Sequence, residues 1–340
     1  MGCNLRDLAT PHPVELADLA GQRVAVDAFL TAYQFITSLR ARGEGQDGGP
    51  LRDSSGRPVA HLMGFLDRAT VMVEAGIDPV FVFDGRPHEL KMDTLAERRS
   101  RKNDAKAKWT AAVEAEDWGT AQKLGSQIAE YTPDMVAETR RMLDLLGIAN
   151  IEAPMEAEGA AAVHCARGEF AAVASQDWDT LLYGSPVMVR NLVSHGTRSF
   201  GRMVRAERVY LHELLEEHGL THAQLVDLGI MIGTDFHPGV KGIGPKTGLK
   251  LIREHGTIEE VCAAKEKEVP ERIDEIRSLF LDHPACNEPL PASGMCDEEG
   301  LREMLVEGHD FSERRIERAL NRLDSGGRLR QGGQTSLFDF

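Results

Sequence analysis

Residues 80–85 read VFVFDG, and residues 23–28 read RVAVDA. Each segment contains a short apolar run that stops at an aspartate. Continuous apolar runs of this length are typical of strands buried on both faces, as in a parallel sheet. The two segments therefore predict an α/β fold and place a carboxylate at the end of each strand.

The sequence on either side of these segments alternates between helical and strand patterns. Leu62, Phe65, Leu66, Ala69 and Val73 have the spacing of one helix face, so a helix is expected between the first two strands. Further strands are expected at 148–151, 171–174 and 187–190. Strands that alternate with helices predict a mainly parallel central sheet flanked by helices on both faces.

Several segments depart from this alternation. Residues 43–57 are rich in Gly, Ser and charge and predict a surface loop. The polar, charged stretch 91–131 predicts two helices that stand away from the core. Residues 207–323 are expected to be mostly helical, and the Gly-rich segment 324–333 is expected to be a linker.

The composition excludes some classes of protein. The chain has 340 residues, a formal charge of −15 and 42% hydrophobic residues, so a sizeable core can form. No apolar run is long enough to span a bilayer, and no secretory leader is expected. Five cysteines without a CxxC pair predict reduced thiols in a cytosol. The acidic total weighs against a nucleic-acid partner, unless the acids are gathered around metal ions.

Acidic residues follow the expected strands or lie in Gly-rich turns. The carboxyl ends of parallel strands share one edge of a sheet, so these side chains are expected to converge. Converging carboxylates without enough basic partners suit hard divalent cations such as Mg²⁺, and two ions could activate water for phosphodiester hydrolysis. The candidate ligands are Asp27, Asp84, Glu156, Glu158, Asp177, Asp179 and Asp235.

Two details of this set are open to other interpretations. A single loop aspartate is more often a helix cap or a turn former than a metal ligand. Asp177 and Asp179 flank Trp178, and in an extended segment both carboxylates would point to one side. The joint placement of seven acids favours the metal site.

The segment KGIGPK, residues 241–246, precedes an expected helix from Pro245 to His255. Its glycines let the backbone approach a phosphate closely, and a helix N-terminus favours anions. A phosphate-binding P-loop is excluded because Pro245 stands where glycine is needed and the spacing is short.

Five segments in order resemble the motifs of the structure-specific 5′ nucleases, and the match is closest to archaeal flap endonucleases. They are VAVDAFLTAYQF, FVFDGRPHELK, EAPMEAEGAAA, ASQDWDTLLYGSP and GTDFHPGVKGIGPKTG. The resemblance implies a PIN-like nuclease fold with a helical arch and a helix–two-turn–helix region. It divides the chain into a nuclease region (1–98), an arch or cap (91–131), an internal nuclease region (132–256), a helical part (257–323) and a linker with a tail (324–340).

The resemblance also implies roles for individual residues. Asp27, Asp84, Glu156 and Glu158 would serve one Mg²⁺, and Asp177, Asp179 and Asp235 the other. Lys91 and Arg98, two helical turns apart, would steer the scissile phosphate. Tyr33 would stack on a base, although core packing is the competing interpretation. Gly2 and the turn residues Lys241, Gly242, Gly244 and Lys246 would contact DNA, with K⁺ as a further candidate ion at the turn.

The implied function is cleavage of 5′ DNA flaps, with 5′–3′ exonuclease activity, in Okazaki-fragment maturation and base-excision repair. The tail QTSLFDF has the spacing of a peptide that binds the sliding clamp PCNA, through Gln334, Leu337 and Phe340. We expect a monomer in the cytoplasm of an archaeal cell, associated with the nucleoid and with no membrane partner.

The sequence departs from the family pattern at two places, and two other functions remain as alternatives. Met155 stands where relatives carry a small polar residue, and the chain starts MGCNL rather than with Ile or Val after Gly2. A 5′ exonuclease or RNase of the same fold is the enzymatic alternative. A non-catalytic DNA-binding protein tethered to the clamp is the other, and the intact acidic set speaks against it.

Overall fold

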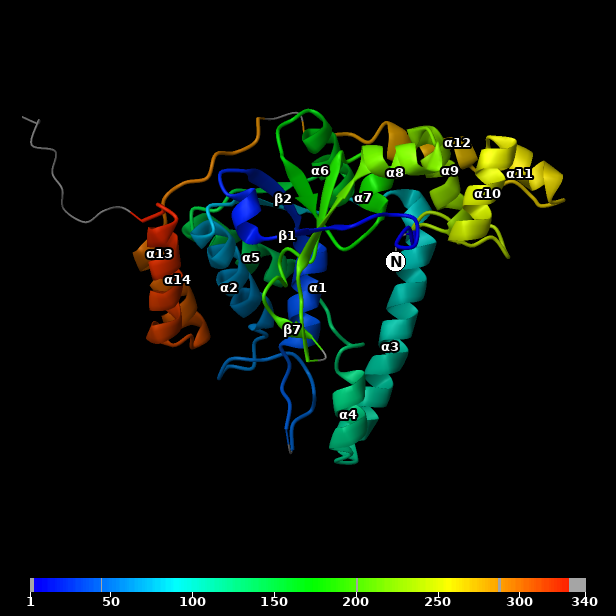
Figure 1. The fold of residues 1–340 in the computed structure, drawn as a ribbon. Coiled ribbons are helices and arrows are strands. Elements are labelled where there is room, and N and C mark those ends of the chain that lie inside the picture. Colours follow the sequence, from blue (N-terminus) through cyan, green and yellow to red (C-terminus); the bar gives the residue numbers. More distant parts are fainter. Residues whose placement is uncertain (1–2, 44, 200, 287–288, 330–340) are drawn as a thin grey trace, which may run out of the picture.

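The computed structural model describes residues 3–43, 45–199, 201–286 and 289–329, and it contains a central sheet with helices on both faces (Figure 1). Seven strands form the sheet in the order β1-β9-β6-β5-β2-β3-β4, and β7 pairs with β8 in a separate ribbon. The strands are β1 His12–Val14, β2 Arg23–Asp27, β3 Asp78–Phe83, β4 Asn150–Glu152, β5 Ala172–Ala174, β6 Val187–Arg190, β7 Arg198–Ser199, β8 Arg202–Met203 and β9 Ala206–Tyr210.

The two apolar segments form the centre of the sheet, as predicted. Strands β6, β5, β2, β3 and β4 are parallel, and Ala25 of β2 is opposite both Val80 and Val173. Val24 and Val26 pack into the core on one face and Ala25 into the core on the other. All three are fully buried, so the mainly parallel α/β fold predicted from these runs is confirmed.

The sheet has two strands that were not predicted, the edge strand β1 and its neighbour β9. β9 pairs antiparallel with β6 and with β1, so the expected helical region starts only after Tyr210. Its sequence, AERVY, alternates buried and half-buried positions instead of forming an apolar run. Because only a continuous apolar run was used as the strand signal, this half-exposed strand was missed.

Helices cover both faces of the sheet. Helices α1, α2, α5 and α14 pack on one face and α6 on the other. The helices are α1 Ala28–Ser38, α2 Ala60–Glu74, α3 Met92–Glu114, α4 Trp118–Leu124, α5 Pro133–Leu145, α6 Ala157–Ala166, α7 Asp179–Leu182, α8 Leu211–His218, α9 His222–Ile232, α10 Pro245–His255, α11 Ile258–Ala264, α12 Ile273–Leu281, α13 Glu298–Arg302 and α14 Glu313–Ser325. Short 3₁₀ turns lie at Leu16–Leu19 and Glu89–Lys91, and a π-helical turn at Glu303–Glu307.

Helices α3 and α4 project from the body of the molecule and pack against each other (Figure 1). Within the 23 residues of α3, only Ala105 and Ala112 are buried. A helix that is polar on nearly all sides has no core to cover, which is why it can stand free of the sheet. We call α3 and α4 the arch.

The tip of the arch contacts the loop between α1 and α2. The indole Nε1 of Trp109 donates to the carbonyl oxygen of Asp47 at 2.8 Å, and Arg40 donates to the carbonyl oxygen of Gln122 at 2.9 Å. Gly48 has φ +72°, and a Cβ there would lie 2.4 Å from the Cα of Gln122. Glycine is required here for both reasons, and the arch and the loop together close a ring.

The C-terminal half adds two helical groups at opposite ends of the sheet (Figure 1). Helices α9 to α12 form a second core with α7 and α8 beside the root of the arch. Helix α14 packs on α2 at the other end. Among the described residues, no helix has both the length and the apolar character that crossing a membrane requires.

Candidate active site

The first carboxylates of the site lie at the ends of the two central strands. Asp27 ends β2 and caps α1, because its Oδ1 accepts a hydrogen bond from the backbone of Leu30 at 2.9 Å. Asp84 follows β3, and its Oδ1 accepts from the backbone of Ala157 at 2.8 Å. Each carboxylate is thus fixed by the first turn of a helix that starts at the same edge of the sheet.

The next pair lies at the start of α6. Glu156 is the N-cap residue of α6, and Glu158 lies in its first turn. The carboxylate of Glu158 accepts a hydrogen bond from the hydroxyl of Ser175, which follows β5, at 2.6 Å. This bond joins the start of α6 to the segment that follows β5.

Asp177 and Asp179 follow β5, but not in the extended conformation that the sequence suggested. Trp178 is helical, with φ −70° and ψ −15°, and Asp179 begins α7. The backbone N–H of Asp179 donates to Oδ1 of Asp177 at 3.2 Å, and Oδ1 of Asp179 accepts from the backbone of Cys3 at 2.7 Å. An aspartate that satisfies the amide two residues later favours a turn over a strand, so the i, i+2 expectation was wrong in its geometry.

Asp235 comes from the loop between α9 and α10 and meets two cations from the root of the arch. Its carboxylate lies 2.5 Å from the guanidinium of Arg98 and 3.5 Å from the ammonium of Lys91. Lys91 also forms an ion pair with Glu156. Burial would lower the pKa of Lys91, but Glu156 and Asp235 raise it above its ordinary range, so the ammonium stays charged.

One cavity of about 1010 Å³ brings these groups together beneath the arch. Six of the seven predicted carboxylates line it, and Asp179 is buried next to it, 5% exposed. The cations lining the cavity are Lys91, Arg98, Arg99, Arg101, Lys102 and Lys106. The floor of the cavity is therefore acidic, and its arch side is basic.

Crowding of carboxylates changes their proton affinity. Burial and the charge of Asp84 raise the pKa of Asp27 to about 7, and burial and Glu156 raise that of Asp84 to about 6. Burial and Asp177 raise the pKa of Asp179 to about 8, and they also raise that of Glu158 well above its usual range. These shifts mean that the acidic floor holds more negative charge than its protein surroundings neutralise.

The donor set fits a hard divalent cation. The donors are carboxylate oxygens, which Mg²⁺ prefers, and their raised pKa values show that added positive charge would be favourable. In the described part of the chain, no three His, Cys, Asp or Glu side chains are positioned so that they could hold a metal ion as they stand. Lys91 and Arg98 instead hold Glu156 and Asp235 in ion pairs.

The other predicted site residues lie at different distances from this cavity. Tyr33 of α1 lines the cavity and is 37% exposed, which contradicts the alternative of ordinary core packing. Lys241, Gly242 and Gly244 lie in the turn before α10 and Lys246 in its first turn, outside the residues that line the cavity. Lys246 is exposed and lies 4.0 Å from Asp7. Gly2, Gln334, Leu337 and Phe340 lie outside the described residues.

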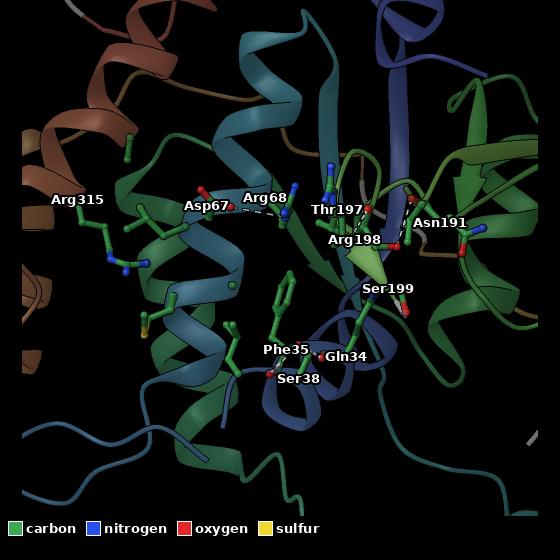
Figure 2. Close-up of a pocket in the computed structure, with 18 of the residues that line it drawn as sticks. Gln34, Phe35, Ser38, Asp67, Arg68, Asn191, Thr197, Arg198, Ser199 and Arg315 are labelled. Carbon is green, nitrogen blue, oxygen red and sulfur yellow. Dashed lines mark hydrogen bonds and ion pairs between the residues drawn. The ribbon is translucent and has the colours of Figure 1, made fainter. Parts of the chain in front are cut away.

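A second cavity, of about 700 Å³, lies between α1, α2, β7 and α14 and was not predicted (Figure 2). Figure 2 shows Gln34 and Ser38 of α1 across from Arg68 of α2, Arg198 of β7 and Arg315 of α14. Arg318 and Arg322 also line it. Arg315, Arg318 and Arg322 are three and four residues apart, which places them on one face of a helix. This spacing is the feature of the sequence that could have indicated the cavity.

Comparisons with known proteins agree with this geometry. Residues 4–105 match the XPG N-terminal domain and residues 147–235 match the XPG I-region. Flap endonuclease 1 from Aeropyrum pernix is 40% identical, over 100% of this chain and 99% of its own. Flap endonuclease 1 from Methanopyrus kandleri is also 40% identical, over 98% of each chain.

Solved structures give the same result. Flap endonuclease-1 from Methanococcus jannaschii superposes with a TM-score of 0.75 and 34% identity, over 96% of this chain and 99% of its own. The catalytic core of Rad2 in complex with DNA substrate has a TM-score of 0.72 at 23% identity, over 95% of this chain and 100% of its own, which supports the fold alone.

The fold is that of an XPG-type structure-specific nuclease. The full-length similarity narrows this class further: the chain belongs to the flap endonuclease 1 family. The resemblance inferred from the five sequence motifs is thereby confirmed.

Proposed function

We propose that the protein cuts DNA carrying a 5′ flap by Mg²⁺-dependent hydrolysis of one phosphodiester, as a structure-specific 5′ flap endonuclease with 5′–3′ exonuclease activity. The observation that carries this proposal is the convergence of carboxylates from five segments of the chain in one cavity beneath the basic arch. The family to which the chain belongs supports the same activity. Okazaki-fragment maturation and base-excision repair are the roles typical of that family.

The metal-holding residues are proposed in two groups. Asp27, Asp84, Glu156 and Glu158 would hold one Mg²⁺, and Asp177, Asp179 and Asp235 the other, in part through water. When bound, the two ions would supply an activated water and stabilise the leaving oxygen. The hydrogen bonds from Leu30, Ala157 and Cys3 aim the carboxylates, so these oxygens are oriented before an ion arrives.

Lys91 and Arg98 are proposed to bind the scissile phosphate. Both already point into the acidic floor from the root of the arch, where they pair with Glu156 and Asp235. A phosphate entering the cavity would exchange places with those carboxylates, which then become available to cations. The charge that develops on the phosphate oxygens during hydrolysis would be stabilised by the same two side chains.

The arch and Tyr33 are proposed to hold the single-stranded flap. Arg99, Arg101, Lys102 and Lys106 line the arch side of the cavity and suit a phosphate backbone. Tyr33 exposes its ring on the opposite wall, where a base could stack. Because the arch and the loop are joined at Asp47 and Gln122, a strand with a free end could thread the ring.

Duplex DNA is proposed to bind outside this cavity. In the turn before α10, Gly242 has φ +87° and open space around it, so the backbone and Lys241 can approach a phosphate. The resemblance to the family is what supports K⁺ as a further ion at this turn. The arginine-lined cavity of Figure 2 is a second phosphate-binding surface of the same kind.

The remaining proposals concern partners and location. We expect Gln334, Leu337 and Phe340 to bind the sliding clamp PCNA, and the enzyme to act as a monomer in an archaeal cytoplasm. Deletion of residues 334–340 should abolish stimulation by the clamp and leave cleavage without the clamp unchanged. Equal stimulation of the shortened and full-length chains would contradict the assignment of the tail.

The test of the central proposal is a cleavage assay on a 5′-labelled flap, with and without Mg²⁺. A single incision near the branch that requires Mg²⁺ is expected, with slower cleavage of a matched nicked duplex and of a matched RNA–DNA duplex. Faster cleavage of the nicked or RNA–DNA substrate would favour the alternative exonuclease or RNase. An uncut flap that is nevertheless bound would favour a non-catalytic DNA-binding protein.

A further inference from the structure

Trp178 stands between two candidate metal ligands, and an arginine from the neighbouring strand covers its ring. The indole is 6% exposed and lies between Asp177 and Asp179 in the sequence. The guanidinium carbon of Arg190 lies 4.4 Å from the centre of the Trp178 ring, within the distance of a cation–π contact. The arginine thus contacts the residue that joins the two carboxylates.

The position of Arg190 in the sheet explains this contact. Arg190 is the last residue of β6, and β6 runs parallel to β5, after which Asp177 and Asp179 follow. On its other side, Arg190 is opposite Glu207 of β9. Arg190 therefore lies at the same edge of the sheet as the acidic floor, next to the segment that carries Asp177.

The burial of the Arg190 guanidinium is unfavourable by itself. Its Nε is buried and has no hydrogen-bond partner in the described part of the chain. Burial lowers the pKa of the guanidinium, and the charges of Glu207 and Asp177 oppose that shift. A desolvated donor without a partner is unfavourable, so the stack on Trp178 and the nearby carboxylates must stabilise the arrangement.

We propose that Arg190 is a positioning residue for the metal site: its guanidinium holds the Trp178 ring and thereby fixes where the Asp177 and Asp179 carboxylates point. Its charge also makes the gathering of these carboxylates less unfavourable. The backbone N–H of Asp177 donates to Oγ of Ser175, and the backbone N–H of Cys3 donates to Asp179, so both ends of the segment are held. Arg190 holds its middle.

The flat guanidinium is what the proposal requires, so lysine is the informative substitution. Lysine keeps the charge but cannot lie flat on the indole. Arg190→Lys should weaken Mg²⁺ and Mn²⁺ binding to the DNA-free protein about tenfold, as loss of a group that orients metal ligands does. Calorimetry measures that affinity. In cleavage, the Mg²⁺ concentration for half-maximal rate should rise by the same factor, with an unchanged KM for the flap.

Arg208 offers a matched control. It lies on the adjacent strand β9, with its guanidinium carbon 5.9 Å from the centre of the Tyr210 ring and a hydrogen bond to the Tyr210 hydroxyl. Its Nε is also buried and has no hydrogen-bond partner among the residues that the structure describes. Its ring partner is not next to a candidate ligand. Arg208→Lys should therefore leave metal affinity and the Mg²⁺ dependence of cleavage unchanged, even if it lowers the melting temperature as much as Arg190→Lys does.

A double-mutant cycle tests whether Arg190 acts through Trp178. In a Trp178→Leu background, Arg190→Lys should weaken Mn²⁺ binding no further, because the stack is already gone. Additive losses, or an Arg190→Lys protein with wild-type metal affinity, would overturn the proposal. Should Arg190→Lys not fold, Trp178→Leu alone decides: wild-type Mn²⁺ affinity overturns the proposal, and weakened affinity supports it.

This inference rests on the proposed metal-dependent function, and the two can fail separately. If Asp179→Ala leaves Mn²⁺ affinity and flap cleavage unchanged, the proposed metal site is wrong. If Asp179→Ala abolishes both while Arg190→Lys changes neither, the metal site stands and only the positioning role of Arg190 is wrong.

Discussion

The acidic floor and the basic arch differ in how they are built. The floor is made of short turns at the ends of buried strands, and each carboxylate there is held by hydrogen bonds or ion pairs. The arch is built on the long polar helix α3, which has two buried residues, and it is tied to the body at its root and at its tip. Rigid placement suits groups that must hold ions in fixed geometry, whereas the exposed arch suits a flexible, charged strand.

Removal of a floor carboxylate should have the largest effect. Asp179→Ala or Asp84→Ala should reduce flap cleavage by about a thousandfold or more, because groups that stabilise charge in the transition state contribute that much. Flap binding, measured by anisotropy in Ca²⁺, should be retained. Asp134→Ala, on the exposed start of α5, is the control and should cleave normally. Normal cleavage by either floor variant would contradict the metal assignment.

Substitutions at the root of the arch should have the next largest effect on cleavage. Lys91→Ala and Arg98→Ala should each lower kcat by about a hundredfold, with little change in KM, because their proposed contact strengthens as charge develops on the phosphate. Single-turnover rates on a saturating flap measure this. Arg141→Ala, at an exposed position of α5 that does not line the cavity, is the control. A rise in KM without a fall in kcat would place these residues in binding alone.

The raised pKa values of the floor predict how pH affects metal-free stability. Burial and Asp84 raise the pKa of Asp27 from 3.8 to about 7, and burial and Asp177 raise that of Asp179 to about 8. The folded state thus keeps protons that the unfolded state has released, so stability is lost as pH rises from about 4 to about 8. Mg²⁺ should relieve this loss.

The melting temperature should therefore rise more on addition of Mg²⁺ at pH 8.5 than at pH 5.5. The control is K⁺ at equal ionic strength, which should produce no such difference. Asp27→Asn should reduce the pH dependence of the Mg²⁺ effect. An equal shift at both pH values would mean that protons and Mg²⁺ do not compete for these carboxylates.

Disrupting the contact between the arch and the α1–α2 loop should have the smallest effect of these changes. Gly48→Ala places a Cβ against Gln122 at a residue with positive φ, so the loop should detach and expose the arch to proteases. Gly56→Ala, with φ +81° but nothing within 4 Å of the added Cβ, controls for backbone strain alone. Equal protease sensitivity of the two variants would show that contact at the tip does not hold the arch.

The sequence was sufficient for the parts of the molecule that rely on local, repeated patterns. Val24 and Val80 identify buried parallel strands, and parallel strands bring their ends to one edge, so the convergence of Asp27 with Asp84 followed from topology. The helix from Pro245 to His255 followed from its proline start and glycine end.

Other features depend on contacts between distant segments, which no local pattern contains. Strand β9 is half-exposed and gives no apolar run. The backbone of Cys3 reaches Asp179, 176 residues away in the chain. The sequence suggested an extended segment at Trp178, whereas the structure has a turn there, because the Asp177 side chain accepts from the amide two residues later. The stack of Arg190 on Trp178 was likewise invisible in the sequence.

The most direct test of the central claim is a crystal structure of the protein grown with Mn²⁺, with anomalous scattering used to locate the ions. Two Mn²⁺ peaks are expected in the cavity beneath the arch, one near Asp84 and Glu156 and one near Asp177 and Asp179. Lys91 should have left Glu156. Peaks only elsewhere, or an empty cavity with Lys91 still paired to Glu156, would contradict it.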